Sequence, residues 1–254
     1  MNQPTAHCAN RTVHDADSHI TEYDGWMEDY ASEYVRDNLD KPFLKIEDIP
    51  ELKPAIAQAQ NRLAGKDPDL TNLLKSDLFG SPGKRNLMAA YGAVNSEERR
   101  DSLDIAGISS QLVFPGLVFA SRFAGSQDPK VVYGGSDAMN RAMVDFCAVD
   151  SARLLSVGYL SLKDPDMALE SARQSIDLGV KSLWMRSDAF EGRAPSHIAY
   201  DPIWALLEDA GVPIVLHIGS GIRMPEEYKN TGVKRVLDPR SMNVETTSPK
   251  DLPV

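Results

Sequence analysis

Residues 200–221 read YDPIWALLEDAGVPIVLHIGSG, and this stretch carries the signals of a helix, a sharp stop and a strand in succession. Asp201 and Pro202 place a capping side chain and a proline at the start of a helix, where proline's fixed φ is favourable. Apolar residues then follow at helical spacing, and Gly211 is the residue type that ends a helix. The run PIVLHI at 213–218 predicts a buried strand. The stretch is therefore one helix-then-strand unit.

The same succession of helix and strand occurs three times upstream. We expect a helix at 95–106 before a strand at 108–115, a helix starting at Ser136 before a strand at 154–162, and a helix at 165–178 before a strand at 180–186. The strand starts are spaced by about 35 residues, as in the βα repeats of a parallel sheet. A further strand at 12–19 gives five strands in all. The fold class predicted is α/β with a parallel sheet.

The domain organisation predicted is a single domain over residues 1–254 with two irregular parts. A helical insertion at about 20–95 separates the first strand from the next βα unit. Long insertions of this kind usually form lids or binding loops. The tail at about 222–254 is rich in proline and charge and predicts irregular structure.

Composition excludes several classes of protein. The 254 residues include 27 Lys and Arg against 37 Asp and Glu, a formal net charge of −10. No basic run opposes this charge, which argues against nucleic acid as the partner. The longest nearly unbroken apolar stretch, 112–120, contains Pro115 and is far shorter than the roughly 18 residues of a membrane span. We therefore expect neither a nucleic-acid partner nor a membrane-spanning helix.

The motifs that the sequence lacks exclude further classes of enzyme. The first residues show no secretory signal, and the two cysteines are far apart without a CxxC pair, so a cytoplasmic protein is expected. The chain has no GxGxxG, P-loop, HExxH or GxSxG motif. A small-molecule enzyme without those common cofactor or nucleophile motifs fits best.

Candidate metal ligands follow two of the predicted strands, at the end where parallel α/β folds place their active sites. Alternation along the strand DADSH points Asp15, Asp17 and His19 to one face, so a carboxylate and an imidazole can converge on one divalent ion. The alternative is that Asp17 and His19 hydrogen-bond a loop. His217 is the only histidine of its apolar strand and opens into a glycine-rich turn. It is either a ligand or a hydrogen-bonded core residue.

A candidate anion-binding residue closes the strand VKSLWMR. Arg186 carries a charge that should not be buried unless it is paired or meets an anionic substrate. The alternative is an ion pair with an acidic neighbour such as Asp188. The residues alone leave these two interpretations open.

Taken together, these stretches resemble the amidohydrolase superfamily, in the branch similar to aminocarboxymuconate semialdehyde decarboxylase. The resemblance covers roughly 13–221 and rests on HDADSHITE, RRDSLDIAGISSQLVFPG, GVKSLWMRS and YDPIWALLEDAGVPIVLHIGSG. It implies a (β/α)8 TIM barrel with one divalent metal, usually zinc and alternatively manganese. It also implies that Asp17, His19 and His217 are the metal ligands and that Arg186 faces a small carboxylic acid substrate.

The chain also departs from the pattern of that family. The family continues for three more βα units, which bring a sixth-strand histidine and an eighth-strand aspartate into catalysis, and this chain has no histidine after His217. Five strands cannot close an eight-stranded barrel. The expectation is therefore an incomplete, C-terminally shortened barrel without assigned catalytic acid–base residues, with Glu22 the first carboxylate to test. Self-association into a homo-oligomer would cover its open sheet edges.

The function expected is that of a metal-dependent carboxy-lyase, which decarboxylates a small unsaturated or aromatic acid. The carboxylate of Asp17 at the first ligand position resembles the decarboxylase-like relatives more than the hydrolases. A metal-dependent hydrolase of an amide, ester or lactone is one alternative. A catalytically inactive homologue or binding protein is the other.

Overall fold

The computed structural model describes residues 11–21, 28–39, 57, 61, 64, 91–116, 123–186, 190 and 193–217. Five parallel strands lie side by side in the order in which they occur along the chain. They are β1 (His14–His19), β2 (Ser110–Phe114), β3 (Leu154–Tyr159), β4 (Ser182–Met185) and β5 (Ile214–Leu216). Every neighbouring pair is parallel, as the alternation of helices and strands predicted.

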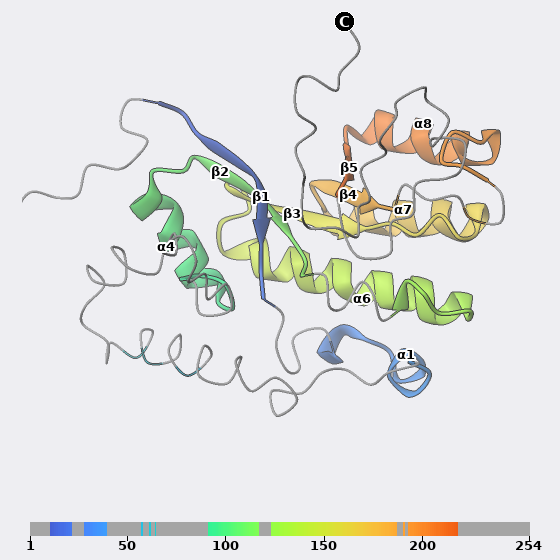
Figure 1. Ribbon diagram of the computed structural model, residues 1–254, viewed down its shortest axis with the longest axis horizontal. Helices are drawn as coiled ribbons and strands as arrows, with labels where there is room; N and C mark the ends of the chain where they lie inside the picture. The colour runs from blue at the N-terminus through green and yellow to red at the C-terminus, as the bar shows by residue number, and fades with distance from the viewer. Residues whose placement is uncertain are drawn as a thin grey trace, which may run out of the picture.

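The helices lie around one side of this sheet (Figure 1). They are η1 (Glu28–Tyr30), α1 (Glu33–Asp37), α4 (Ser96–Ala106), α6 (Pro129–Cys147), η4 (Ala148–Asp150), α7 (Pro165–Leu178), η5 (Ile198–Tyr200) and α8 (Asp201–Ala210). α6 packs on β3 and on its neighbour α7, which in turn contacts α8. In the described part of the chain, no helix is long and apolar enough to cross a membrane.

The helix ends follow the capping chemistry expected from the sequence, with two differences. Asn95 and Asp164 accept N–H bonds from Glu98 and Met167, and left-handed Gly107 and Gly179 end those helices. The helix expected from Ser136 begins seven residues earlier, because Asp128 caps it through the N–H of Lys130 and a proline follows. Asp201 makes no capping bond, because α8 continues directly from η5.

The sheet is strongly curved, and contacts between its two outer strands show this directly. Four interstrand spacings of about 4.8 Å would separate β1 from β5 by about 19 Å in a flat sheet. Yet the Nε2 atoms of His19, at the end of β1, and His217, directly after β5, are 3.1 Å apart. The carboxyl ends of the outermost described strands therefore meet.

A buried hydrogen-bond cluster joins the helical layer to the sheet. Asn140 on α6 accepts the Tyr159 N–H at 2.7 Å and donates to the Tyr159 carbonyl at 3.1 Å and to Ser175 Oγ on α7 at 2.9 Å. Gly158 makes room for it, since a Cβ there would lie 2.9 Å from Asn140 Oδ1. One amide side chain thus fixes α6, β3 and α7 relative to one another.

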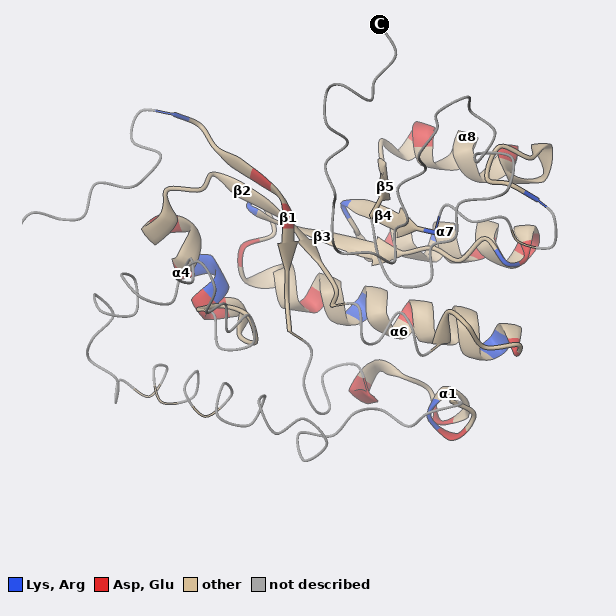
Figure 2. Cartoon of the chain, viewed as in Figure 1, with Lys and Arg blue, Asp and Glu red and all other residues tan. Residues whose placement is uncertain are grey.

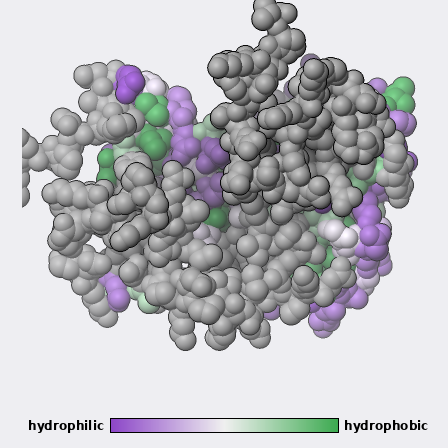
Figure 3. All heavy atoms as spheres, in the orientation of Figure 1, coloured by the Kyte–Doolittle hydropathy of each residue, from purple (hydrophilic) through white to green (hydrophobic). Residues whose placement is uncertain are grey.

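The described helices carry both acidic and basic residues (Figure 2). Figure 2 shows Lys and Arg dispersed among Asp and Glu over the helices. On the face shown in Figure 3, hydrophilic and hydrophobic described residues are interspersed.

Some sequence expectations fall outside the described residues. These include Glu22, Asp188, most of the insertion at 20–95 and the tail at 222–254. The domain division therefore stays a prediction.

Candidate metal centre

Three side chains meet at the carboxyl end of the curved sheet: Asp17 and His19 from β1, and His217 from the residue after β5. His217 Nε2 lies 2.9 Å from Asp17 Oδ1 and 3.1 Å from His19 Nε2. Asp17 Oδ1 lies 3.2 Å from His19 Nε2. The sequence brought these three residues together as candidates, and the structure places them in contact.

The hydrogen bond at the other ring nitrogen fixes the tautomer of His19. Nδ1 lies 3.0 Å from the carbonyl oxygen of Pro115, which directly follows β2. A carbonyl oxygen can only accept, so the geometry assigns the proton of neutral His19 to Nδ1. Nε2 then presents a lone pair toward Asp17 and His217. Histidine ligands of metals are usually held by such a bond at the second nitrogen.

The donor set fits a divalent cation. A carboxylate oxygen and two imidazole nitrogens are ligands that zinc accepts, at about 2.0–2.2 Å. In a tetrahedral site such atoms lie roughly 3.3 Å apart, close to the distances found here. With neither a cation nor an added proton on an imidazole, the lone pairs of Asp17 Oδ1 and His19 Nε2 face each other at 3.2 Å. A positive ion would relieve that repulsion.

The exposed fractions of the three side chains show which side of the cluster faces solvent. The Asp17 side chain is 70% exposed, His19 34% and His217 18%. Phe114, only 2% exposed, packs against both imidazoles with ring centroids 5.4 Å and 5.1 Å away. Trp184 lies edge-on to His217 at 6.3 Å. The cluster therefore rests on a buried aromatic floor, and its solvent side is available for water or substrate.

Asp15 is not one of the three clustered residues, although strict alternation would point it to the same face as Asp17 and His19. The pairing of β1 with β2 shifts between Asp15 and Ser18, where two residues of β1 oppose one of β2. This bulge breaks the alternation. Asp15 instead accepts the N–H of Asp17 at 3.0 Å and a bond from Gln111 Nε2 at 3.2 Å.

Arg186 directly follows β4, at the same end of the sheet as the three candidate ligands, and is partly buried. Its expected partner Asp188 lies outside the described residues. The placement is compatible with an anion-binding role, which stays a prediction.

Sequence reasoning missed Arg99 and Pro115. Arg99, on α4, donates from Nη1 to Ser18 Oγ at 2.8 Å and from Nη2 to the His19 carbonyl. Pro115 contributes through its main chain, so its residue type carried no signal. Arg99 is followed by a second arginine in a polar helix, where nothing in the sequence distinguishes a buried side chain from a solvated one.

Comparison with solved structures supports the barrel assignment. An amidohydrolase from Mycobacterium avium subsp. paratuberculosis K-10 aligns with a TM-score of 0.60 at 20% identity, covering 83% of this chain and 60% of that one. A 5-carboxyvanillate decarboxylase from Novosphingobium aromaticivorans DSM 12444, complexed with manganese and 4-hydroxy-3-methoxy-5-nitrobenzoic acid, aligns with a TM-score of 0.50 at 15% identity. That alignment covers 86% of this chain and 54% of the decarboxylase. The chain thus spans less than two thirds of either protein, and its five strands correspond to part of a (β/α)8 barrel.

Comparison by sequence identifies the family. No curated protein gives a significant match. The family model described as amidohydrolase matches residues 97–249, which is more than half of the chain. This chain belongs to the amidohydrolase family.

Proposed function

We propose that the protein is a metal-dependent carboxy-lyase, which removes CO2 from a small unsaturated or aromatic carboxylic acid. The observation that carries the proposal is the contact of Asp17, His19 and His217 at the open end of the sheet. Zinc is the expected ion and manganese the alternative. A bound divalent ion would supply Lewis acidity to the substrate's carboxylate or to an adjacent oxygen.

The chain's own residues orient and shield the reactants. Pro115 holds the His19 ring with its lone pair toward the centre. Phe114 and Trp184 close the buried side of the cluster, so a flat conjugated acid would lie between an apolar floor and solvent. Arg186, at the end of the neighbouring strand, is proposed to hold the substrate's carboxylate by charge-assisted hydrogen bonds.

The proposed reaction breaks the bond between the carboxylate carbon and its unsaturated neighbour. The electron pair of that bond is delocalised into the ring or diene as CO2 leaves, and a proton from solvent then bonds to the carbon that carried the carboxylate. The choice of an aromatic acid is supported by the decarboxylase with a similar fold, which is complexed with manganese and a substituted benzoic acid.

The test compares the purified protein with a ligand variant. Protein loaded with Zn²⁺ or Mn²⁺ is incubated with a panel of hydroxybenzoic and unsaturated dicarboxylic acids, and released CO2 and the decarboxylated product are measured. Turnover by the wild type and its loss in His217→Ala are expected. Arg186→Lys should raise KM more than it lowers kcat, because the charge stays and the two-pronged bond is lost.

Two other results would replace the proposal. Hydrolysis of an amide, ester or lactone panel, without CO2 release from any acid, would make the protein a metal-dependent hydrolase. Metal binding without turnover of either panel would identify an inactive homologue or a binding protein.

A further inference from the structure

We propose that Arg99 is a positioning residue for the metal centre. It fixes, from helix α4, the end of the strand that supplies Asp17 and His19. This inference rests on the proposed metal centre and adds a residue that does not touch the ion.

The contacts of Arg99 place it directly behind the two candidate ligands. Its Nη1 donates to the hydroxyl of Ser18, the residue between Asp17 and His19, and its Nη2 donates to the carbonyl of His19 itself. Arg99 is 7% exposed and Ser18 6% exposed. A planar guanidinium that makes two such bonds fixes direction as well as distance.

The part of β1 that carries Asp17 needs this support because the sheet ladder is irregular there and becomes regular again only at Ser18 and His19. Asp15 pairs with Gln111 and Ser18 with Val113, so β1 has one extra residue between these two points. The N–H of Asp17 donates a hydrogen bond to the side chain of Asp15. Asp17 is therefore held by Asp15 on one side and, through Ser18, by Arg99 on the other.

The position of Arg99 along its helix is itself fixed. The carboxylate of Glu98 accepts the N–H of Gly92, and Gly92 adopts φ +78° against the Arg99 backbone, where a Cβ would lie 2.6 Å from Arg99 Cα. After β1, the N–H of Thr21 bonds to the Ala93 carbonyl at 2.7 Å. The helix start and the end of β1 thus form one connected unit.

Burying the charge of Arg99 is unfavourable, so its presence on the buried face of α4 indicates a specific structural role. Desolvation lowers the pKa of Arg99 to about 10, partly offset by Cys147 and Asp15, so the side chain stays charged at neutral pH. Both acceptors named above are neutral groups. An apolar residue would fill the space without this penalty, but it would leave Ser18 and His19 without their donor.

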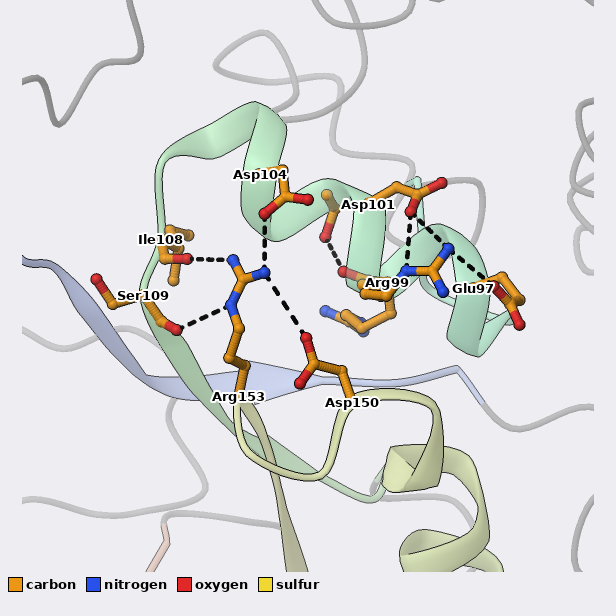
Figure 4. Close-up of polar contacts among 10 residues, drawn as sticks. Glu97, Arg99, Asp101, Asp104, Ile108, Ser109, Asp150 and Arg153 are labelled. Carbon is orange, nitrogen blue, oxygen red and sulfur yellow. Dashed lines mark hydrogen bonds and ion pairs between the residues drawn. The ribbon is translucent and has the colours of Figure 1, made fainter.

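Arg153 provides a matched control, because its bonds lie at the start of β2 and not at the carboxyl end of the sheet. Figure 4 shows its contacts with Asp104, Ile108, Ser109 and Asp150. Arg153 precedes β3 and donates to the carbonyls of Ser109 and Ile108 at 3.1 Å and 3.0 Å, and to Asp104 at 2.8 Å. It therefore holds the start of β2, far along the strand from the candidate ligands. Its replacement loosens the start of β2 and, through Asp104, the last turn of α4, and it leaves the bonds of Arg99 to Ser18 and His19 in place.

The experiment measures Zn²⁺ and Mn²⁺ dissociation constants, by competition with a chelating dye, for the wild type, Arg99→Lys and Arg153→Lys. Melting temperatures of the metal-free proteins are recorded alongside. Arg99→Lys should weaken metal binding about 10- to 100-fold, the usual effect of losing a group that orients a ligand. Arg153→Lys should lower the melting temperature with an unchanged dissociation constant. Equal dissociation constants for Arg99→Lys and the wild type would overturn the proposal, as would equal weakening in both variants.

A second pair of variants applies where Arg99→Lys does not fold. Ser18→Ala removes one acceptor of Arg99 and keeps the charge, and Ser110→Ala removes the hydroxyl that contacts His14 Nδ1 at the other end of β1. Weaker metal binding in Ser18→Ala alone supports the positioning role, and unchanged binding in Ser18→Ala overturns it. If the wild type binds neither ion, the proposed metal centre itself is wrong. If the wild type binds metal and the Arg99 variant binds it equally well, only the positioning role of Arg99 is wrong.

Discussion

At the scale of single residues, His217 follows one outer strand of the sheet, whereas Asp17 and His19 lie on the other. Replacing His217 therefore tests whether the three residues bind one metal ion together or only form hydrogen bonds with one another. His217→Ala should reduce bound Zn²⁺ or Mn²⁺ from about one ion per chain to a small fraction of that, because two remaining ligands hold an ion poorly. Elemental analysis after dialysis against metal-free buffer measures this. His197→Ala is the control, since the side chain of that exposed histidine accepts the Ala199 N–H at the start of η5 and is not among the three clustered residues. Equal metal content in His217→Ala and the wild type would exclude His217 from the site.

Cys147 is a residue whose chemistry is set by burial. It is 2% exposed, as expected for a core cysteine, and burial raises the pKa of its thiol to about 12, with Arg99 opposing the rise. The folded state therefore holds this proton more tightly than the unfolded state. Its contribution to stability is present below the ordinary pKa of 9.0 and is lost as pH rises through 12. At pH 8 the thiol of the folded protein therefore stays protonated.

We expect that thiol to be unreactive until the protein unfolds. In a Cys8→Ser variant, where Cys147 is the sole thiol, a disulfide reagent at pH 8 should release no colour within minutes from the folded protein. It should release one equivalent in denaturant. Rapid reaction under native conditions would show that the core around Cys147 opens.

The site could be predicted in part because parallel strands bring their carboxyl ends to one edge. That rule identified Asp17, His19 and His217, whose side chains the structure brings into contact; whether they bind metal stays a prediction. The role of Asp15 could not be predicted, because the bulge in β1 depends on its pairing with β2. Arg99 and Arg100 are identical neighbours in sequence, yet one is buried and the other pairs with Glu97 and Asp101 at the surface. Only tertiary packing separates them.

At the scale of elements, local signals predicted the order of helices and strands but set their ends less well. β5 is shorter than its apolar run suggested, and His217 lies just outside it. The early start of α6 could have been predicted from the sequence, because Asp128 and Pro129 form the same capping Asp–Pro pair as Asp164 and Pro165. The Asp201–Pro202 pair has the same sequence as these two pairs, yet Asp201 does not cap its helix.

The element most dependent on one side chain is the junction of α6, β3 and α7. Asn140→Ala would leave the buried Tyr159 N–H without its acceptor and open space beside Gly158. We expect a loss of about 2–3 kcal/mol in the free energy of unfolding, or roughly 4–12 °C in Tm. Denaturant unfolding and calorimetry measure these quantities.

The next residue on the same helix gives the control for Asn140. Arg141 is 53% exposed and pairs with Asp137 one turn away, so Arg141→Ala should change stability by less than about 0.5 kcal/mol. Similar losses in the two variants would mean that the Asn140 cluster does not hold the layers together.

At the scale of the whole molecule, the α/β class, the five parallel strands and the barrel family followed from the alternation of elements and the resemblance. The sequence could not show how tightly the sheet curves. Curvature is a sum of small twists between neighbouring strands, and it became visible only through the contact of His19 with His217. The insertion was predicted as helical and the tail as irregular, and most of both lies outside the described residues.

The outer strand β5 gives the last prediction, because it ends the described sheet with apolar side chains toward solvent. Ile214 is 36% exposed and Leu216 63% exposed. Exposed apolar residues on an outer strand favour pairing with another chain, and charge on such a strand opposes it. We therefore expect the protein to self-associate with rising concentration, and Leu216→Lys to shift it toward monomer. Light scattering coupled to size exclusion measures the mass. Ile198→Lys is the control, since Ile198 is 75% exposed but lies on η5, away from the sheet. A wild type that stays monomeric at all concentrations, or an equal shift in both variants, would show that β5 is not where the copies meet.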